Sequence, residues 1–118
     1  MADYVDGFVV PVPKAKLEDY KTLARTASHV WLEHGALDYR EWIADDVKPG
    51  KVTSFPQSVN MAEDETVVFA WISYESRAHR NAVNEKVMKD PRMQNDPSKW
   101  PFDGKRMIFG GFAPLLEE

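Results

Sequence analysis

Three charged residues lie inside segments that are otherwise typical of β-strands. Asp6 lies in YVDGFVV, Glu41 in ALDYREWI and Arg106 in RMIFGGF. Acidic side chains are depleted in strands and are rarely buried without a partner. If the protein forms a dimer that encloses a cavity, Asp6 or Glu41 could accept a proton there as a desolvated carboxylate. Arg106 could hold a carboxylate or an enolate of a ligand. The alternative is a structural ion pair, either across strands or across a dimer interface. Structural ion pairs shift the pKa values of their members just as active sites do.

A second group of side chains could bind an apolar molecule. Ligand pockets are lined mostly by aromatic and aliphatic side chains, with a few placed polar groups. The same residues would also fit an association surface, where aromatic side chains are enriched. The candidate ligand-binding residues are Phe8, Trp42, Phe69 and Trp71, with Lys105 as an anion anchor at the mouth of the cavity.

The residues needed for most other site chemistry are missing from the sequence. The chain has no cysteine, so disulfides, thiolate nucleophiles and cysteine-based zinc sites are excluded. Its three histidines form no metal signature, since His29 and His34 are five positions apart and no HExxH pattern occurs. The serines stand beside no sign of a catalytic base. We therefore expect neither a metal nor a cofactor.

The stretch WPFDGKRMIFGGF, Trp100 to Phe112, resembles a phosphate loop only in its glycines. A phosphate loop precedes a helix, whereas this stretch enters a strand. Asp103-Gly104 is more typical of a turn that sets the register of the last strand. Gly110-Gly111 fits either a β-bulge or the close approach of another backbone. The sequence thus favours an architectural role here.

Length, charge and hydropathy restrict the class of protein. The 118 residues suit one domain, residues 1–118, with a single core. A net charge of -4 and a pI near 5.4 argue against nucleic-acid binding, which needs a basic face. No secretory leader and no apolar run of membrane-spanning length is present, so we expect no membrane partner and a cytoplasmic location.

Hydrophobic periodicity predicts four strands, two helices and one irregular arm. The strands are rich in β-branched and aromatic residues, and the helices have apolar residues three and four positions apart. Prolines end the first strand, and Ser76 is the expected N-cap of the second helix. The predicted strands are Tyr4–Val10, Ala36–Ile43, Thr66–Tyr74 and Arg106–Phe112; the helices are Ala15–His34 and Arg77–Lys89; the arm is Asp45–Asp64, with a short strand over KVTSF.

The order βαββαβ predicts an α+β, ferredoxin-like fold, a four-stranded antiparallel sheet with two helices on one face. Alternation along Thr66–Tyr74 puts Val67, Phe69, Trp71 and Ser73 on one face and Val68, Ala70, Ile72 and Tyr74 on the other, and both faces are largely apolar. Two helices can cover only one of these faces. The other would be a larger apolar patch than monomers usually expose. We therefore expect a homodimer in which a second copy covers it.

Five segments together resemble a known family. The segments YVDGFVVPVP, DVKPGKVTSFP, ETVVFAWISY, DPRM and PFDGKRMIFGGF are similar, in order and over nearly the whole chain, to the YbaA-like family of small bacterial proteins of unknown function. The resemblance implies the dimeric α/β-barrel superfamily, in which two open sheet faces meet around a barrel-like cavity. Relatives in that superfamily include antibiotic-synthesis monooxygenases, haem-degrading enzymes and muconolactone isomerases.

Three functional hypotheses follow from the sequence. The first is a homodimer of uncharacterised function with a cavity, between or beside the sheets, for a small apolar or aromatic molecule. The second is a cofactor-independent monooxygenase or isomerase acting on a small enolisable aromatic substrate, with Asp6 or Glu41 as the base and Arg106 as the anion partner. The third is a purely structural or regulatory dimer whose cavity is filled by side chains.

Overall fold

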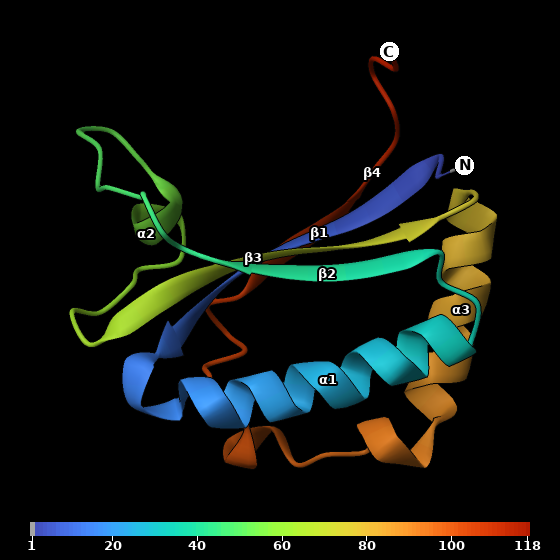
Figure 1. Ribbon diagram of the computed structural model, residues 1–118, viewed down its shortest axis with the longest axis horizontal. Coiled ribbons are helices and arrows are strands. Elements are labelled where there is room, and N and C mark those ends of the chain that lie inside the picture. Colours follow the sequence, from blue (N-terminus) through green and yellow to red (C-terminus); the bar gives the residue numbers. More distant parts are fainter. Residues whose placement is uncertain (1) are drawn as a thin grey trace.

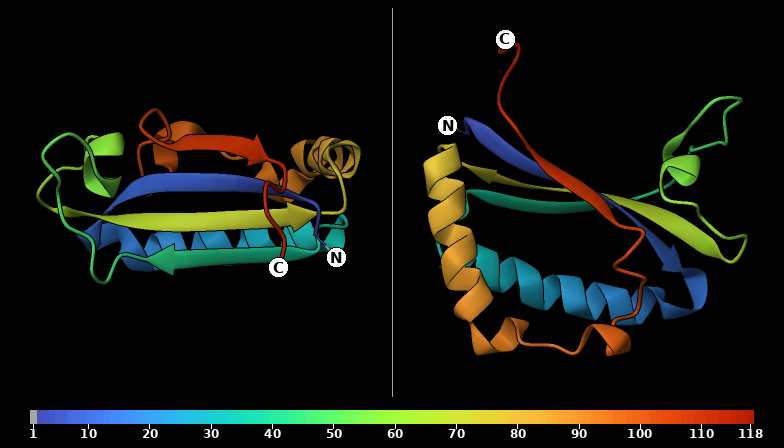
Figure 2. Two further views of the ribbon diagram at one scale, coloured as in Figure 1. Left: turned by 90° about the horizontal axis from the view of Figure 1, so that it is seen from above. Right: turned by 180° about the vertical axis from the view of Figure 1, so that it is seen from behind.

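The computed structural model describes residues 2–118 and contains one antiparallel sheet with the two long helices on one side (Figure 1). The sheet has four strands in the order β2-β3-β1-β4, which Figure 2 shows from above. This confirms the predicted α+β class and the four-stranded antiparallel sheet. The elements are β1 (Tyr4–Pro13), α1 (Leu17–Glu33), β2 (Asp38–Ile43), α2 (Phe55–Ser58), β3 (Glu65–Tyr74), α3 (Arg77–Lys89) and β4 (Ile108–Phe112), with 3-10 turns at Lys14–Lys16, Pro91–Met93 and Pro97–Lys99.

Helices α1 and α3 cover one face of the sheet, called here the helix face (Figure 1). Every second residue of β3 is buried there, and α1 and α3 supply the opposing aliphatic side chains. Each fully buried side chain of this kind contributes about 1.5–3 kcal/mol. Helix α1 ends at Gly35, whose φ of 116° suits glycine after a helix. The core residues of the helix face are Val10, Val12, Val30, Val68, Ile72, Tyr74, Val83 and Val87.

Strand β1 runs three residues further than predicted, through Pro11 and Pro13. The prediction that prolines end this strand was wrong. Both prolines pair with β3, opposite Val67 and Glu65, but β4 reaches only as far as Val9. The Lys14 amide donates to the Asp64 carbonyl on the β3 side, at 2.9 Å. Successive backbone nitrogens point to alternate sides of a strand, so those of Pro11 and Pro13 point to the other side, where β4 has ended. The missing N–H therefore breaks no ladder hydrogen bond.

The arm, residues 44–64, folds over one end of the second sheet face, which we call the open face. Val59 of the arm is buried against Val9 and Val67. The short strand predicted over KVTSF is absent from the described residues, and a single-turn helix, α2, begins there instead. Ser54 caps it, accepting a hydrogen bond from the Gln57 amide at 3.3 Å. Within residues 2–118 nothing else covers the open face (Figure 1).

The C-terminal segment keeps the predicted turn but starts its strand two residues late. The Asp103 carboxylate accepts a hydrogen bond from the Lys105 amide at 3.0 Å, as an Asx turn does. Arg106 precedes β4, so it is not a strand residue as predicted. The β1–β4 register is regular through Gly110 and Gly111, so neither forms a bulge. The close approach is made by a side chain, because a Cβ on Gly111 would lie 2.2 Å from the Tyr4 hydroxyl oxygen.

Substituting the two neighbouring glycines tests this packing. Gly111→Ala should lower the free energy of unfolding by about 1–3 kcal/mol, because the new methyl group overlaps Tyr4. Gly110→Ala is the matched control, since its Cβ would lie 3.9 Å from the closest side-chain atom. Chemical denaturation of both variants measures the difference. Equal effects would show that Tyr4 does not occupy the space above Gly111.

Candidate functional site at the edge strand

Glu41 is the most unusual carboxylate in the sheet. It lies on the edge strand β2, paired with Ala70, and therefore points to the helix face. Its two oxygens accept hydrogen bonds from Tyr20 of α1 and, at 2.7 Å, from Tyr39 two residues earlier on the same face of β2. No Lys or Arg in residues 2–118 forms an ion pair with it. Of the described residues, two phenols and no cation thus hold the half-buried carboxylate.

The two tyrosine hydroxyls that bind Glu41 remain protonated at any physiological pH. Burial, and then the charge of Glu41, raise the pKa of Tyr20 and of Tyr39 well above the ordinary value of 10. Trp31 lies beside Tyr39 with ring centres 6.2 Å apart, and Phe102 meets Tyr20 edge-on at 5.6 Å. Ring packing holds the two tyrosine side chains in place, and the raised pKa values keep their hydroxyls protonated as donors to Glu41. We call Tyr20, Tyr39 and Glu41 the edge cluster.

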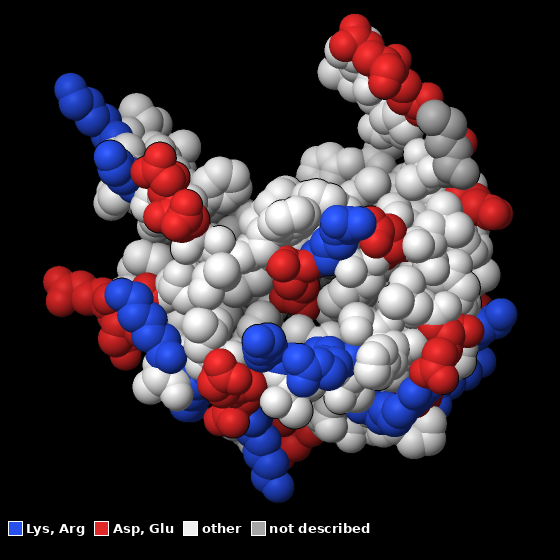
Figure 3. Space-filling view, in the orientation of Figure 1, with Lys and Arg blue, Asp and Glu red and all other residues white. Residues whose placement is uncertain are grey.

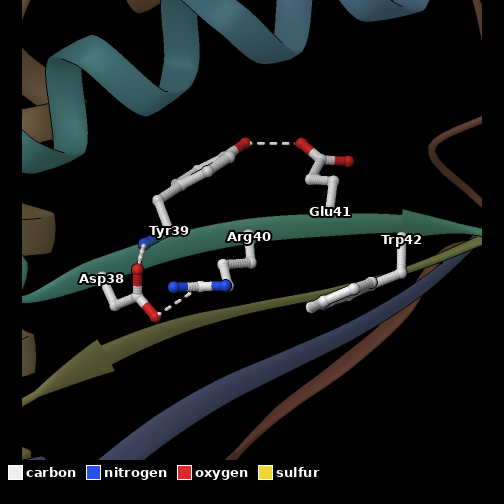
Figure 4. A pocket seen from close by; sticks show the side chains of 5 residues that line it. All are labelled: Asp38, Tyr39, Arg40, Glu41 and Trp42. Carbon is white, nitrogen blue, oxygen red and sulfur yellow. Dashed lines mark hydrogen bonds and ion pairs between the residues drawn. The ribbon is translucent and has the colours of Figure 1, made fainter.

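A shallow hollow of about 380 Å³ follows the outer edge of β2, lined by residues 38–42 (Figure 4). Figure 4 shows Glu41 and Tyr39 pointing toward α1 and Trp42 pointing to the opposite side of the strand. The ion pair between Arg40 and Asp38, 3.0 Å long, lies at the other end of the hollow. In Figure 3 acidic and basic side chains lie together near the centre of the view, over β2, with further basic side chains just below them. The hollow therefore combines a carboxylate, an indole ring and the unpaired outer edge of a strand.

Asp6 also faces the helices rather than the open face. It is buried, and it accepts a hydrogen bond from Arg80 of α3 at 2.6 Å. The Arg80 guanidinium lies 5.1 Å from the centre of the Tyr4 ring. Burial, followed by the Asp6 charge, raises the pKa of the adjacent Tyr74 well above 10. The surroundings of Asp6 are those of a buried structural ion pair.

Arg106 binds the start of β3. Its guanidinium donates to both carboxylate oxygens of Glu65, at 2.8 and 2.7 Å, and to the Asn60 carbonyl at 2.9 Å. A further bond of 3.1 Å reaches Asp103. Because Arg106 donates to the buried Glu65, the pKa of that carboxyl lies below its ordinary value of 4.5. Arg106 therefore ties the arm to the segment before β4, while Lys105 beside it is exposed.

The sheet register separates the three charged candidates. Glu41 pairs with Ala70 of β3. Glu65, which binds Arg106, lies roughly 16 Å from Ala70 along the same strand. Asp6 lies two strands from Glu41, level with Ile72, a separation of roughly 12 Å. Both strands place Asp6 and Glu41 toward the helices, so neither projects from the open face toward a second sheet. They do not form a common site.

The aromatic candidates divide between the two faces. Phe8 lies on the helix face with Ala70, whereas Phe69, Trp71 and Trp42 lie on the open face. Ring centres of Trp42 and Trp71 are 5.5 Å apart, those of Trp71 and Phe69 5.7 Å, and those of Phe69 and Phe55 of the arm 6.2 Å. We call these four residues the aromatic row. It crosses the open face from β2 to the arm.

The residues that bind Glu41 and Asp6 were not predicted from the sequence. Tyr39 could have been found, since it precedes Glu41 by two positions and alternation puts both on one face. Tyr20 and Arg80 gave no local signal, because they reach Glu41 and Asp6 from helices far away in sequence. Within residues 2–118 no three acidic or histidine side chains are grouped as metal ligands, and no helix has the length and apolar character to cross a membrane.

Comparison with known proteins identifies the family. A family model described as "Protein of unknown function (DUF1428)" matches residues 3–104. The chain belongs to this family. Relatives in the DUF1428 family include the uncharacterised protein YbaA of Escherichia coli K12 and that of Shigella flexneri, each 50% identical over 115 residues, covering 98% of both chains.

A solved structure supports the fold of this DUF1428 chain. A crystal structure of an uncharacterised NIPSNAP domain protein from Burkholderia xenovorans superimposes with a TM-score of 0.64, covering 98% of this chain and 99% of that one. The two sequences are 18% identical, so the likeness concerns the fold alone. The predicted similarity to YbaA and the predicted α+β fold with a four-stranded antiparallel sheet are therefore confirmed. The comparisons name no reaction.

Proposed function

We propose that the protein is a homodimer that binds a small hydroxylated aromatic molecule at the edge cluster. The observation that carries the binding role is Glu41 at the rim of a hollow, a carboxylate that residues 2–118 supply with two phenol donors and no cation. A carboxylate oxygen has room for more than one donor. A ligand hydroxyl can therefore bind Glu41 from the hollow without displacing Tyr20 or Tyr39.

The dimer rests on the open face. The aromatic row includes Trp42, Phe55 and Phe69, each of which is exposed in this chain, and Phe112 and Ile108 of β4 extend it. An apolar surface of this kind, continuous across a sheet, is typical of an interface rather than of a monomer surface. A two-fold partner would bury the same residues on both copies. Because Trp42 belongs to both the row and the hollow, a partner there would also form a wall of the ligand site.

The chemistry of the hollow favours phenols over aromatic acids. A ligand hydroxyl supplies the donor that Glu41 lacks on its outer side, whereas a ligand carboxylate would repel it. The Trp42 indole lines the same hollow from the opposite side of the strand, so a ligand that reaches round the outer edge of β2 from Glu41 can stack its ring there. The ligand class is therefore a small phenol or quinol.

A thermal-shift series tests the site. Quinols should raise the melting temperature, and their O-methyl ethers, which cannot donate, should not. Glu41→Gln should weaken binding of the quinol at least about tenfold, because a charge-assisted hydrogen bond is lost. Glu85→Gln, an exposed residue on α3, is the matched control and should bind as the unaltered protein does. Equal binding of quinol and ether, or unchanged binding by Glu41→Gln, would contradict the assignment.

A second candidate function is cofactor-independent oxygenation or isomerisation of such a ligand. The observation that favours it is that Glu41 has no cation partner in the part of the chain that the structure describes, whereas Asp6 and Arg106 are both held in ion pairs. The base would then be Glu41, taking the hydroxyl proton of the ligand. In the oxygenation, dissolved oxygen is the co-reactant: a quinol takes up one oxygen atom and is oxidised to the hydroxyquinone, and the other oxygen atom leaves as water. Oxygen consumption with a bound quinol measures this. Turnover retained in Glu41→Gln would remove Glu41 from the role of base.

A further inference from the structure

Two projections rise from opposite ends of the open face. One is the arm, residues 44–64, and the other is the C-terminal tail, residues 113–118, which continues β4 beyond Phe112. Figures 1 and 2 both show them at opposite ends of the strands and on the same side of the sheet, with the helices on the other side. The open face between them is therefore a saddle with a wall at each end, as Figure 3 also shows.

Both projections expose apolar side chains. Leu115 is 100% exposed and Leu116 is 76% exposed on the tail, and Val52 is 92% exposed on the arm. Single exposed aliphatic residues are common on surfaces. Here they lie at the ends of segments that already protrude beside an apolar face. A partner on that face would come within reach of both segments.

The outer ends of the projections carry opposite charge. The tail ends in Glu117 and Glu118 and has no basic residue. The basic residues of the arm are Lys48 and Lys51, and Figure 3 shows Lys and Arg side chains at its outer end, with acidic side chains closer to the body of the protein. Opposite charges attract most where both groups meet away from other charges. The two tips are thus complementary to each other.

This charge pattern selects one arrangement of a face-to-face pair. A two-fold axis along the strands would put arm against arm and tail against tail, so that lysines face lysines and four glutamates meet. A two-fold axis across the strands puts each arm beside the tail of the partner at both ends of the interface. Like charges in contact oppose association, whereas opposite charges favour it. The second arrangement is the complementary one.

We infer that the C-terminal tail of each subunit docks on the arm of the partner, with Leu115 and Leu116 against Val52 and Glu117 and Glu118 beside Lys48 and Lys51. This inference rests on the proposed homodimer. It adds the orientation of the two-fold axis and two equivalent contacts, one at each end of the interface. We call each contact, between the tail of one subunit (residues 113–118) and the arm of the other (residues 44–64), a clasp. The occupant of the arm tip is therefore a second copy of this chain.

Cysteine cross-linking tests the clasp directly, since the chain has no cysteine of its own. Val52→Cys and Leu115→Cys are prepared separately and mixed so that subunits exchange, and a mild oxidant is added. A covalent dimer should form in the mixture and in neither variant alone. Glu85→Cys on the outer side of α3, mixed with Leu115→Cys, is the control for random collision and should give no covalent dimer.

Other cross-linking results would contradict the clasp without contradicting the homodimer. Cross-linking of Leu115→Cys with itself would show tail against tail. No cross-linking in any mixture, while sedimentation finds a dimer, would show that the tail does not reach the arm. Sedimentation as a monomer would instead contradict the proposed homodimer, and the clasp with it.

Charge reversal gives a second, independent readout. Glu117→Lys with Glu118→Lys should weaken the dimer about tenfold at low salt, since two exposed contacts are reversed at each end. Lys48→Glu with Lys51→Glu should do the same. All four substitutions in one chain should restore the affinity, because every tail again meets an arm of opposite charge. Additive losses in the fourfold variant would contradict the clasp.

Discussion

Phe69→Asp is expected to convert the dimer into a folded monomer. Phe69 stands in the middle of the aromatic row, 40% exposed in the single chain, and contacts Trp71 and Phe55. A carboxylate buried there without a partner costs several kcal/mol. Because a two-fold interface buries the substitution twice, the dissociation constant should rise about 1,000-fold or more. Sedimentation velocity measures the loss.

Phe109→Asp is the matched control for this substitution. Phe109 is also a phenylalanine on a strand, and at 70% exposure it is the more accessible of the two. It pairs with Phe8, however, and so lies toward the helix face. If exposure alone governed association, Phe109→Asp would disrupt the dimer more. The account expects it to remain dimeric, and monomers from both variants, or from neither, would show that the open face is not the interface.

Asp6→Ala is expected to cause a large loss of stability. It removes one partner of a buried ion pair and leaves Arg80 with its charge in the space between β1 and α3. The free energy of unfolding should fall by about 3 kcal/mol, which in a domain of this size lowers the melting temperature by roughly 10 °C. Urea denaturation followed by circular dichroism measures it.

Glu85→Ala serves as the control for Asp6→Ala. Glu85 forms an ion pair with Lys89 on the exposed side of α3, 3.4 Å long. Pairs of this kind contribute less than about 0.5 kcal/mol, so the stability should barely change. A loss for Asp6→Ala no greater than that for Glu85→Ala would mean that the buried pair does not support the sheet–helix contact.

The division of the sheet into two faces could be predicted because alternation along a strand is fixed by geometry. The sequence assigned Phe69 and Trp71 to one face and Val68 and Ala70 to the other, and the register confirms it. Which face receives the helices could not be read from β3, since both faces are apolar. That choice depends on long-range pairs such as Arg80 with Asp6, for which no local pattern exists.

The arm was predicted incorrectly for a local reason that the sequence does contain. The segment KVTSF has β-forming residues, but Ser54 and Gln57 stand three apart, as in a helix capping box. The structure has the Ser54 side chain at the start of α2, accepting from the Gln57 amide and donating to its side chain at 2.6 Å. A strand in this place would also have needed a partner that the sheet does not supply.

The central claim is that a second copy of the chain covers the open face. Sedimentation equilibrium of the unaltered protein at roughly 1 to 50 micromolar tests it most directly, because a specific interface of ordinary size holds together in this range. The account predicts one species of twice 13.5 kDa throughout. A single species of 13.5 kDa across the same range would contradict it.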